Sequence, residues 1–224
     1  MNKKAVFIAP HADDESLGCG GTILKYIDKG WEVHWLLVSN MSEEAGYSED
    51  QVRNRKEVIN KAFQEYNFYK FHEFNLMPGK LDEVPMSHLV GLLSEYFDQI
   101  QPSHVFTCFG GDAHTDHKVV FNAVISATKS FRKNFIKKVF AYETISETDY
   151  GNDITSISFQ PNIYIDISKY FKRKVEIIKF YDAEIGEFPF PRSIKAIEAL
   201  SNIRGSQSCC NHAESFMLIK ELLD

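Results

Sequence analysis

Short apolar runs alternate with amphipathic helical patterns through most of this 224-residue chain. The strand-like runs cover residues 5–9, 32–39, 71–76, 104–109 and 139–143. The helical patterns between them cover residues 17–29, 49–66, 86–99 and 116–128. A strand, a helix and a further strand in succession form a parallel βαβ unit. The alternation therefore predicts an α/β fold, with a Rossmann-like, mostly parallel sheet and helices on both of its faces.

The C-terminal third departs from this alternation. Residues 154–167 are strand-like, and residues 168–185 have an amphipathic helical pattern. A turn at 188–192 (FPFPR) and a last helix at 213–223 complete the expected elements. Because the sequence contains no internal repeat, low-complexity segment or evident linker, we expect one domain over residues 1–224.

Charge and composition exclude several classes of protein. The formal net charge of −6 argues against a surface for nucleic acid or anionic membrane. The four cysteines include no CxxC pair, so the sequence indicates neither a disulfide framework nor a zinc ribbon. The first apolar run is too short for a secretory signal, and no stretch approaches the ~20 apolar residues of a membrane span. We therefore expect a cytoplasmic protein without a membrane span.

The sequence PHADDE, residues 10–15, directly follows the first strand. His11 and Asp14 are three residues apart, so at the opening of a helix they can face one point. Three adjacent carboxylates repel one another unless a cation is present. Imidazole with carboxylate suits zinc or iron(II) better than calcium. The alternative, acidic residues that favour the dipole of a helix N-terminus, explains one or two carboxylates but neither His11 nor the run of three.

Three glycines follow this motif, at positions 18, 20 and 21. Their order, GCGG, does not match the GxGxxG pattern of a dinucleotide-binding loop. Acidic residues also stand where a pyrophosphate would approach. We therefore expect the glycines to let the first helix pack tightly on the sheet.

The sequence GGDAHTDH, residues 110–117, follows the fourth strand. In open parallel sheets, ligands bind outside the carboxyl ends of the strands, so this segment and PHADDE are expected to meet at one site. A lone histidine is more often an ordinary surface or core residue than a ligand. Two histidines and two aspartates in one strand-to-helix loop are better explained by a functional site.

Together the two segments supply a candidate ligand set of His11, Asp14 and His117. Three protein ligands leave a position open for water, as in catalytic metal sites. Water bound there loses a proton near neutral pH, and a base must accept it. Asp13 is the candidate base, because it lies beside the ligands without being needed as one.

The remaining polar residues of these segments have candidate supporting roles. His114, as imidazolium, could stabilise an oxyanion or protonate a leaving amine. Asp112 or Asp116 could orient a histidine by accepting its ring proton. Glu15 could support the ligands or cap the helix.

PHADDE, the glycines after it and the later HTDH resemble the LmbE-like or PIG-L family of N-acetylglucosaminyl deacetylases. The family has proline where this chain has Ala12 and Thr115, and neither side chain performs chemistry. The resemblance implies that His11, Asp14 and His117 are zinc ligands. It implies further that Asp13 is the general base and that His114 stabilises the charge of the reaction.

The resemblance extends to shorter segments of the C-terminal third. FQPNIYIDIS, FPFPRS, RG and HAESF are similar to segments of the bacterial branch, which implies that this third belongs to the same domain and walls the substrate pocket. Arg192 and Arg204 are candidates to bind sugar hydroxyls, a carboxylate or a phosphate, against the alternative of structural arginines. Tyr142, at the end of a strand, is a third candidate. The resemblance also implies that Arg53 or Arg55, together with Glu57, corresponds to a helix motif of the family.

The expected activity is that of a zinc-dependent N-deacetylase, a hydrolase that cleaves a linear amide C–N bond. Its substrate is an N-acetylated amino sugar, whether free, nucleotide-linked or lipid-linked, and its metal is zinc or iron(II). The alternative substrate is an N-acyl group on a non-sugar amine. Two other classes are disfavoured. A metal- or sugar-binding domain without catalysis does not account for Asp13 beside a three-ligand site, because structural zinc sites are closed by four ligands. An iron(II) oxygenase is opposed by the resemblance. A homo-oligomer stays open, with Phe188 and Phe190 as candidates for an interface or the pocket.

Overall fold

The computed structural model describes residues 3–151 and 158–223. Within this part of the chain, seven strands form one sheet in the order β3-β2-β1-β4-β5-β7-β6. Neighbouring strands are parallel from β3 through to β5, whereas β7 is antiparallel to both β5 and β6. The strands are β1 (Lys4–Ala9), β2 (Glu32–Ser39), β3 (Lys70–Leu76), β4 (His104–Cys108), β5 (Lys138–Tyr142), β6 (Ile163–Asp166) and β7 (Ala213–Glu221). The prediction of a mostly parallel sheet is confirmed.

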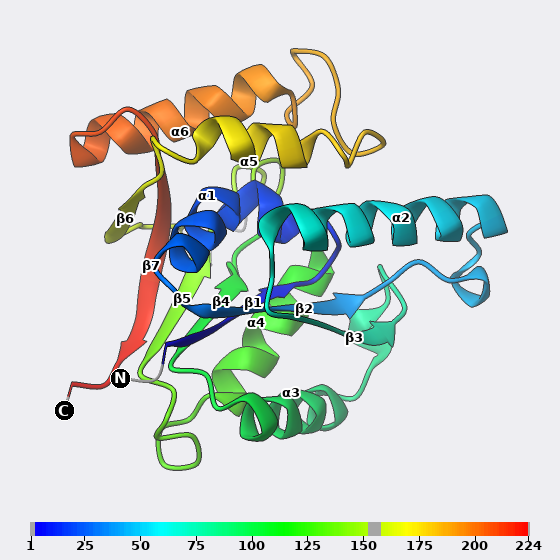
Figure 1. Cartoon of the computed structure of the whole chain (residues 1–224). Helices are drawn as coiled ribbons and strands as arrows, with labels where there is room; N and C mark the ends of the chain where they lie inside the picture. The colour runs from blue at the N-terminus through cyan, green and yellow to red at the C-terminus, as the bar shows by residue number, and fades with distance from the viewer. Residues whose placement is uncertain (1–2, 152–157, 224) are drawn as a thin grey trace.

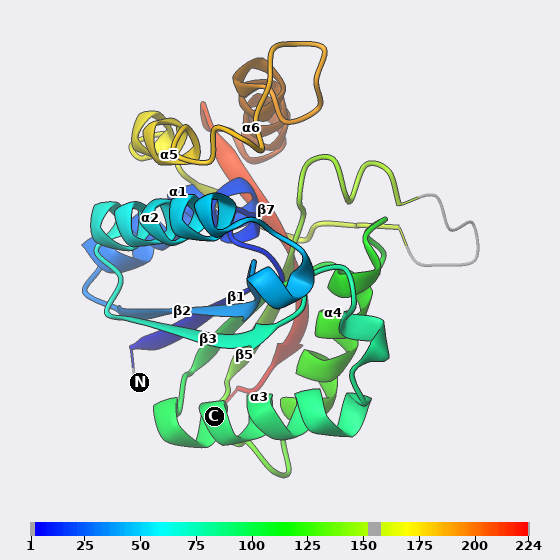
Figure 2. The same ribbon diagram turned by 90° about the vertical axis from the view of Figure 1, so that its right-hand side faces the viewer.

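Helices cover both faces of the sheet, as predicted (Figures 1 and 2). One face carries α1 (Asp14–Asp28), α2 (Glu49–Tyr66), α5 (Phe171–Ile178) and α6 (Ile194–Ser208). The other carries α3 (Met86–Ile100) and α4 (Thr115–Ala127). Two short 3-10 helices, η1 (Glu43–Ala45) and η2 (Leu81–Glu83), lie in loops. Among the described residues, none of the helices is long and apolar enough to cross a membrane.

The central strands explain why the sequence predicts the sheet so clearly. Strand β4 is buried along its whole length, and β1 and β2 are buried at all but their first residue. Parallel strands that are covered on both faces have continuous apolar sequences, as these do. Phe7 of β1 and Phe106 of β4 stack with ring centroids 4.3 Å apart, which locks these two neighbours together.

The chain changes direction across the sheet between β1 and β4. From β1 it proceeds outward to β2 and β3, then returns to the other side of β1 to form β4 and β5. The loops after β1 and β4 therefore diverge at the carboxyl edge and leave a crevice, which is where open α/β sheets bind ligands.

The glycines of α1 have the packing role that the sequence predicts. A Cβ atom on Gly18 would lie 2.4 Å from Cδ2 of Tyr142 and 2.8 Å from the carbonyl oxygen of Glu143. Such distances are impossible without movement of the sheet, so glycine lets α1 lie directly on β5.

The C-terminal third contains the errors of the secondary-structure prediction. Residues 213–223 are not a helix but mostly the strand β7. Helix α6 was not predicted, although Ser193 caps it by accepting a hydrogen bond from the Ala196 N–H. The helix predicted at 168–185 is limited to α5, and the strand predicted at 154–167 to β6, with residues 154–157 outside the described part of the chain.

Buried polar residues conceal the strand pattern of β7. Glu214 is buried because its carboxylate accepts hydrogen bonds from the Gly21 and Thr22 N–H groups, at 2.8 and 2.7 Å. The ammonium of the buried Lys174 lies 2.7 Å from the same carboxylate. These partners come from distant parts of the sequence, so local polarity alone cannot reveal that Glu214 faces the interior.

Candidate active site

The β1–α1 loop folds around the carboxylate of Asp14. Asp14 is the first residue of α1, and its Oδ2 accepts a hydrogen bond of 2.9 Å from the His11 N–H. The same oxygen lies 3.4 Å from Nδ1 of His11 and 3.2 Å from Nε2 of His117. Burial disfavours ionisation of Asp14, but His117 and His11 outweigh it and hold the pKa of Asp14 well below its ordinary value.

The residues that the sequence predicts as ligands lie together. One ligand atom each from His11, Asp14 and His117 falls within 4.8 Å of the others. Nε2 of His117 is buried and, although it lies 3.2 Å from Oδ2 of Asp14, it has no hydrogen-bond partner among the described residues, which is unusual for a buried polar atom. A cation among these three groups would satisfy that nitrogen, and two imidazoles with a carboxylate suit zinc or iron(II). The residues therefore fit a metal, and their role as ligands stays a prediction.

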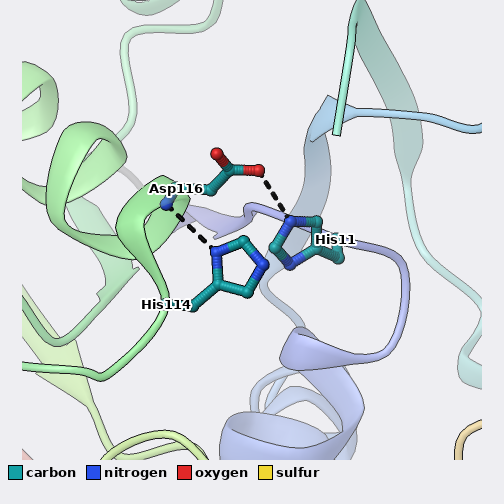
Figure 3. A group of neighbouring side chains, drawn as sticks. All are labelled: His11, His114 and Asp116. Carbon is teal, nitrogen blue, oxygen red and sulfur yellow. Dashed lines mark hydrogen bonds and ion pairs between the residues drawn. The ribbon is translucent and has the colours of Figure 1, made fainter. Parts of the chain in front are cut away.

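Two further aspartates orient the histidines. Nε2 of His11 lies 2.9 Å from Asp116, and Nδ1 of His117 lies 2.7 Å from Asp112 (Figure 3 shows the first pair). Because an ionised carboxylate only accepts hydrogen bonds, each of these ring nitrogens carries the proton. Burial opposes protonation of both rings, but Asp116 and Asp14 raise the pKa of His11 to about 9, and Asp14 and Asp112 raise the pKa of His117. Nδ1 of His11 and Nε2 of His117, which face Asp14, therefore also carry protons, and a bound metal ion would displace them. The sequence predicts this role for one aspartate or the other, and both perform it.

His114 has a different protonation state from the one that the sequence suggests. It is the N-cap of α4, and its Nδ1 accepts a hydrogen bond of 3.1 Å from the Asp116 N–H (Figure 3). Burial lowers the pKa of His114, as do the neighbouring His11 and His117. The ring is therefore neutral, with its proton on Nε2, and can donate a hydrogen bond without being an imidazolium.

Asp13 lies beside the candidate ligands without joining them. Its Oδ2 accepts a hydrogen bond of 3.0 Å from Nη1 of Arg192. Burial and the neighbouring carboxylate of Asp14 raise the pKa of Asp13 to about 6, although Arg192 acts in the opposite direction. A carboxylate with such a pKa can accept and return a proton near neutral pH.

An alternating chain of charges connects Asp13 to helix α2. Arg192 contacts Glu184 at 3.4 Å, and Glu184 forms an ion pair with Arg55. Arg55 in turn donates a hydrogen bond of 2.7 Å to the carbonyl oxygen of Ala12, the residue before Asp13. Of the two arginines that the sequence leaves open, Arg55 therefore belongs to the site.

A pocket of about 270 Å³ opens above these residues. Its walls include all five residues to which the sequence assigns catalytic or ligand roles, which are His11, Asp13, Asp14, His114 and His117. Arg192 also lines it, whereas Phe188 and Phe190 are exposed outside its lining. The sequence missed Glu184 and Glu147, which lie outside every motif. The volume is just below the range of about 300–1,000 Å³ for small-molecule sites.

Tyr142 and Arg204, predicted to contact substrate, are absent from the described lining of this pocket. Tyr142 is fully buried and donates a hydrogen bond of 2.8 Å to the carbonyl oxygen of Ile8, so it has no surface for a ligand. Arg204 donates two hydrogen bonds, of 2.8 and 2.6 Å, to the carboxylate of Glu143. Tyr142 therefore connects β5 to β1, and Arg204 connects α6 to the residue after β5. Neither has the substrate contact that the sequence predicts.

Glu15 does not face the pocket either. It is buried and accepts hydrogen bonds from the hydroxyl groups of Ser16 and Tyr181, at 2.7 and 2.8 Å. Burial raises the pKa of Glu15 to about 8. The carboxyl group anchors α1 to the segment after α5.

Comparisons with known proteins give a family match and a fold match. The model of the PIG-L family, described as GlcNAc-PI de-N-acetylase, matches residues 6–128. The uncharacterized deacetylase YaiS of Escherichia coli K12 is 22% identical over 183 residues, 79% of this chain and 89% of that protein.

Among solved structures, N,N'-diacetylchitobiose deacetylase from Pyrococcus horikoshii matches with a TM-score of 0.73 and 18% identity, over 97% of this chain and 84% of that one. GalB, the 4-carboxy-2-hydroxymuconate hydratase of Pseudomonas putida KT2440, matches with a TM-score of 0.71 and 15% identity, over 99% and 98%. Because both a deacetylase and a hydratase have this fold, the fold alone does not select a reaction.

Asp112→Asn tests whether Asp112 increases the metal affinity of the candidate site by orienting His117. The amide can no longer hold the His117 ring proton as an ionised carboxylate does, so we expect zinc affinity to fall about 10- to 100-fold. Competition with a chelator measures this affinity, and the exposed Asp149→Asn is the matched control. Equal affinity in both variants would show that Asp112 does not orient a ligand.

Proposed function

The chain belongs to the PIG-L family, and on that premise we propose that it is a metal-dependent hydrolase that removes the acetyl group from the nitrogen of an amino sugar. The family match covers residues 6–128 and so includes both histidine motifs, which confirms the resemblance that the sequence indicates. One observation carries the proposal: two imidazoles and a carboxylate lie together in the wall of one pocket, beside a further carboxylate, Asp13, that is not part of this group. The names of YaiS and of the chitobiose deacetylase support the same activity.

We propose that His11, Asp14 and His117 hold zinc, with iron(II) as the alternative metal. When bound, such a cation polarises an amide carbonyl and makes water acidic enough to lose a proton near neutral pH. With the cation bound, Asp112 and Asp116 would keep the protons on Nδ1 of His117 and Nε2 of His11 through the hydrogen bonds of 2.7 and 2.9 Å, which leaves the other nitrogen of each ring to the metal.

Asp13 is the proposed base. Arg192 holds its Oδ2, while Oδ1 has no hydrogen bond with any described residue and is free to take a proton from the attacking water. The water oxygen then bonds to the acetamide carbon, the C–N bond breaks, and acetate and a free amine result. A base close to its pKa at neutral pH can return the proton as readily as it accepts it.

His114 is the proposed hydrogen-bond donor to the oxyanion. Its Nδ1 lone pair is occupied by the Asp116 N–H, so the Nε2–H group is what it offers to the pocket. A neutral imidazole that gave up this proton would become an anion, which is unfavourable beside carboxylates. We therefore assign protonation of the leaving amine to Asp13, and to His114 only stabilisation of the developing charge.

Acetate release from a panel of N-acetylated compounds tests the activity. The panel includes free, nucleotide-linked and lipid-linked N-acetylated sugars together with N-acylated amines that are not sugars. We expect release from a sugar by the zinc-loaded protein and loss of release after chelation, because the carbonyl is then no longer polarised. Release only from non-sugar amides would show that the substrate is an N-acylated amine that is not a sugar. No release from any compound would overturn the proposed activity.

Asp13→Asn tests the proposed base. An amide of the same size cannot accept the proton, so we expect kcat to fall about 10²- to 10⁴-fold while zinc content stays that of the wild type. The exposed Asp182→Asn, on the segment that carries Glu184, is the control. Full activity would exclude Asp13 as the base, and loss of zinc would make it a ligand instead.

A further inference from the structure

One carboxylate in the pocket wall has no partner among the residues that the structure describes. Glu147 lines the pocket, yet its carboxylate has no hydrogen bond or ion pair within residues 3–151 and 158–223. The other charged side chains of the lining are all engaged: Arg192 with Asp13 and Glu184, and Arg55 with Glu184. Glu147 is thus the charged group of the described lining that remains available to a ligand.

The backbone that carries Glu147 is held on both sides. Its N–H donates a hydrogen bond of 3.1 Å to the carbonyl oxygen of Thr144, and its own carbonyl oxygen accepts one of 3.0 Å from the Ala113 N–H. The next residue, Thr148, donates through its N–H to the same Thr144 oxygen at 2.8 Å. A side chain on such a closed turn has little positional freedom beyond its own rotamers.

The turn is also tied to the candidate metal centre. The Thr148 hydroxyl donates a hydrogen bond of 2.6 Å to Oδ1 of Asp112. The other oxygen of Asp112 accepts the His117 ring proton at 2.7 Å. One carboxylate therefore binds both a candidate ligand and the turn that presents Glu147, so two consecutive hydrogen bonds connect His117 to this turn.

An ionised carboxylate only accepts hydrogen bonds, so its natural ligand is a group rich in donors. The hydroxyl groups of a sugar ring are such donors, and a half-buried carboxylate that receives them recovers the interactions that it lost with water. Resting on the function proposed above, we propose that Glu147 binds hydroxyl groups of the sugar ring and thereby selects sugars over other N-acetylated amines.

Steady-state kinetics of Glu147→Gln and Glu147→Ala test this role on the sugar that the wild type deacetylates best. We expect KM to rise about 10- to 100-fold, as for a lost hydrogen bond to a charged group, while kcat changes less than about threefold and zinc content stays unchanged. Asp149→Asn, exposed on the same turn, is the matched control and is expected to behave as the wild type.

Deoxy analogues of the sugar identify the contact. The wild type is expected to lose affinity for the analogue that lacks the bound hydroxyl, whereas Glu147→Gln loses little more on that analogue, because the two changes remove the same interaction. An unchanged KM in both variants, or equal losses on every analogue, would overturn the assignment. Lower zinc content in the variants would make Glu147 a metal ligand and likewise refute it. If the wild type deacetylates no sugar at all, the proposed function fails first and this inference with it.

Discussion

The buried carboxylate of Asp14 between two imidazoles is the contact on which the rest of the site depends. Its Oδ2 lies within 3.4 Å of His11 Nδ1 and 3.2 Å of His117 Nε2, and it also accepts the His11 N–H. A negative charge removed from water is costly unless positive groups surround it. The chain meets this requirement by bringing the loops after β1 and β4 together at the point where the order of the sheet reverses.

The same supports serve the metal centre and the substrate wall. Asp112 holds His117 and the turn at Thr148, while Asp116 holds His11 and accepts the Gly79 and Leu81 N–H groups at 2.7 and 3.1 Å. Each aspartate thus connects a candidate metal ligand to a loop of the pocket. Sites built in this way keep their geometry because the supporting groups are themselves fixed.

The sequence predicted the parts of this protein that depend on local pattern. Buried parallel strands have continuous apolar runs, and the ligand residues follow directly after two of them, so the sheet and the grouping of His11, Asp14 and His117 were both foreseeable. The partners of long polar side chains were not. Arg192 reaches Asp13, whereas Arg204 binds Glu143, and nothing local distinguishes the two arginines. The sequence favours a helix where strand β7 lies, because the buried polar residues of the strand are satisfied by distant segments.

Zinc-edge anomalous diffraction from crystals grown with zinc tests most directly whether the two motifs form one catalytic metal centre. We expect one anomalous peak bounded by His11, Asp14 and His117, with at least one coordination position not taken by a protein atom. Asp13 should lie beside the peak without coordinating it. A peak elsewhere, or an ion enclosed by four protein ligands, would contradict the proposed centre and the hydrolysis that depends on it.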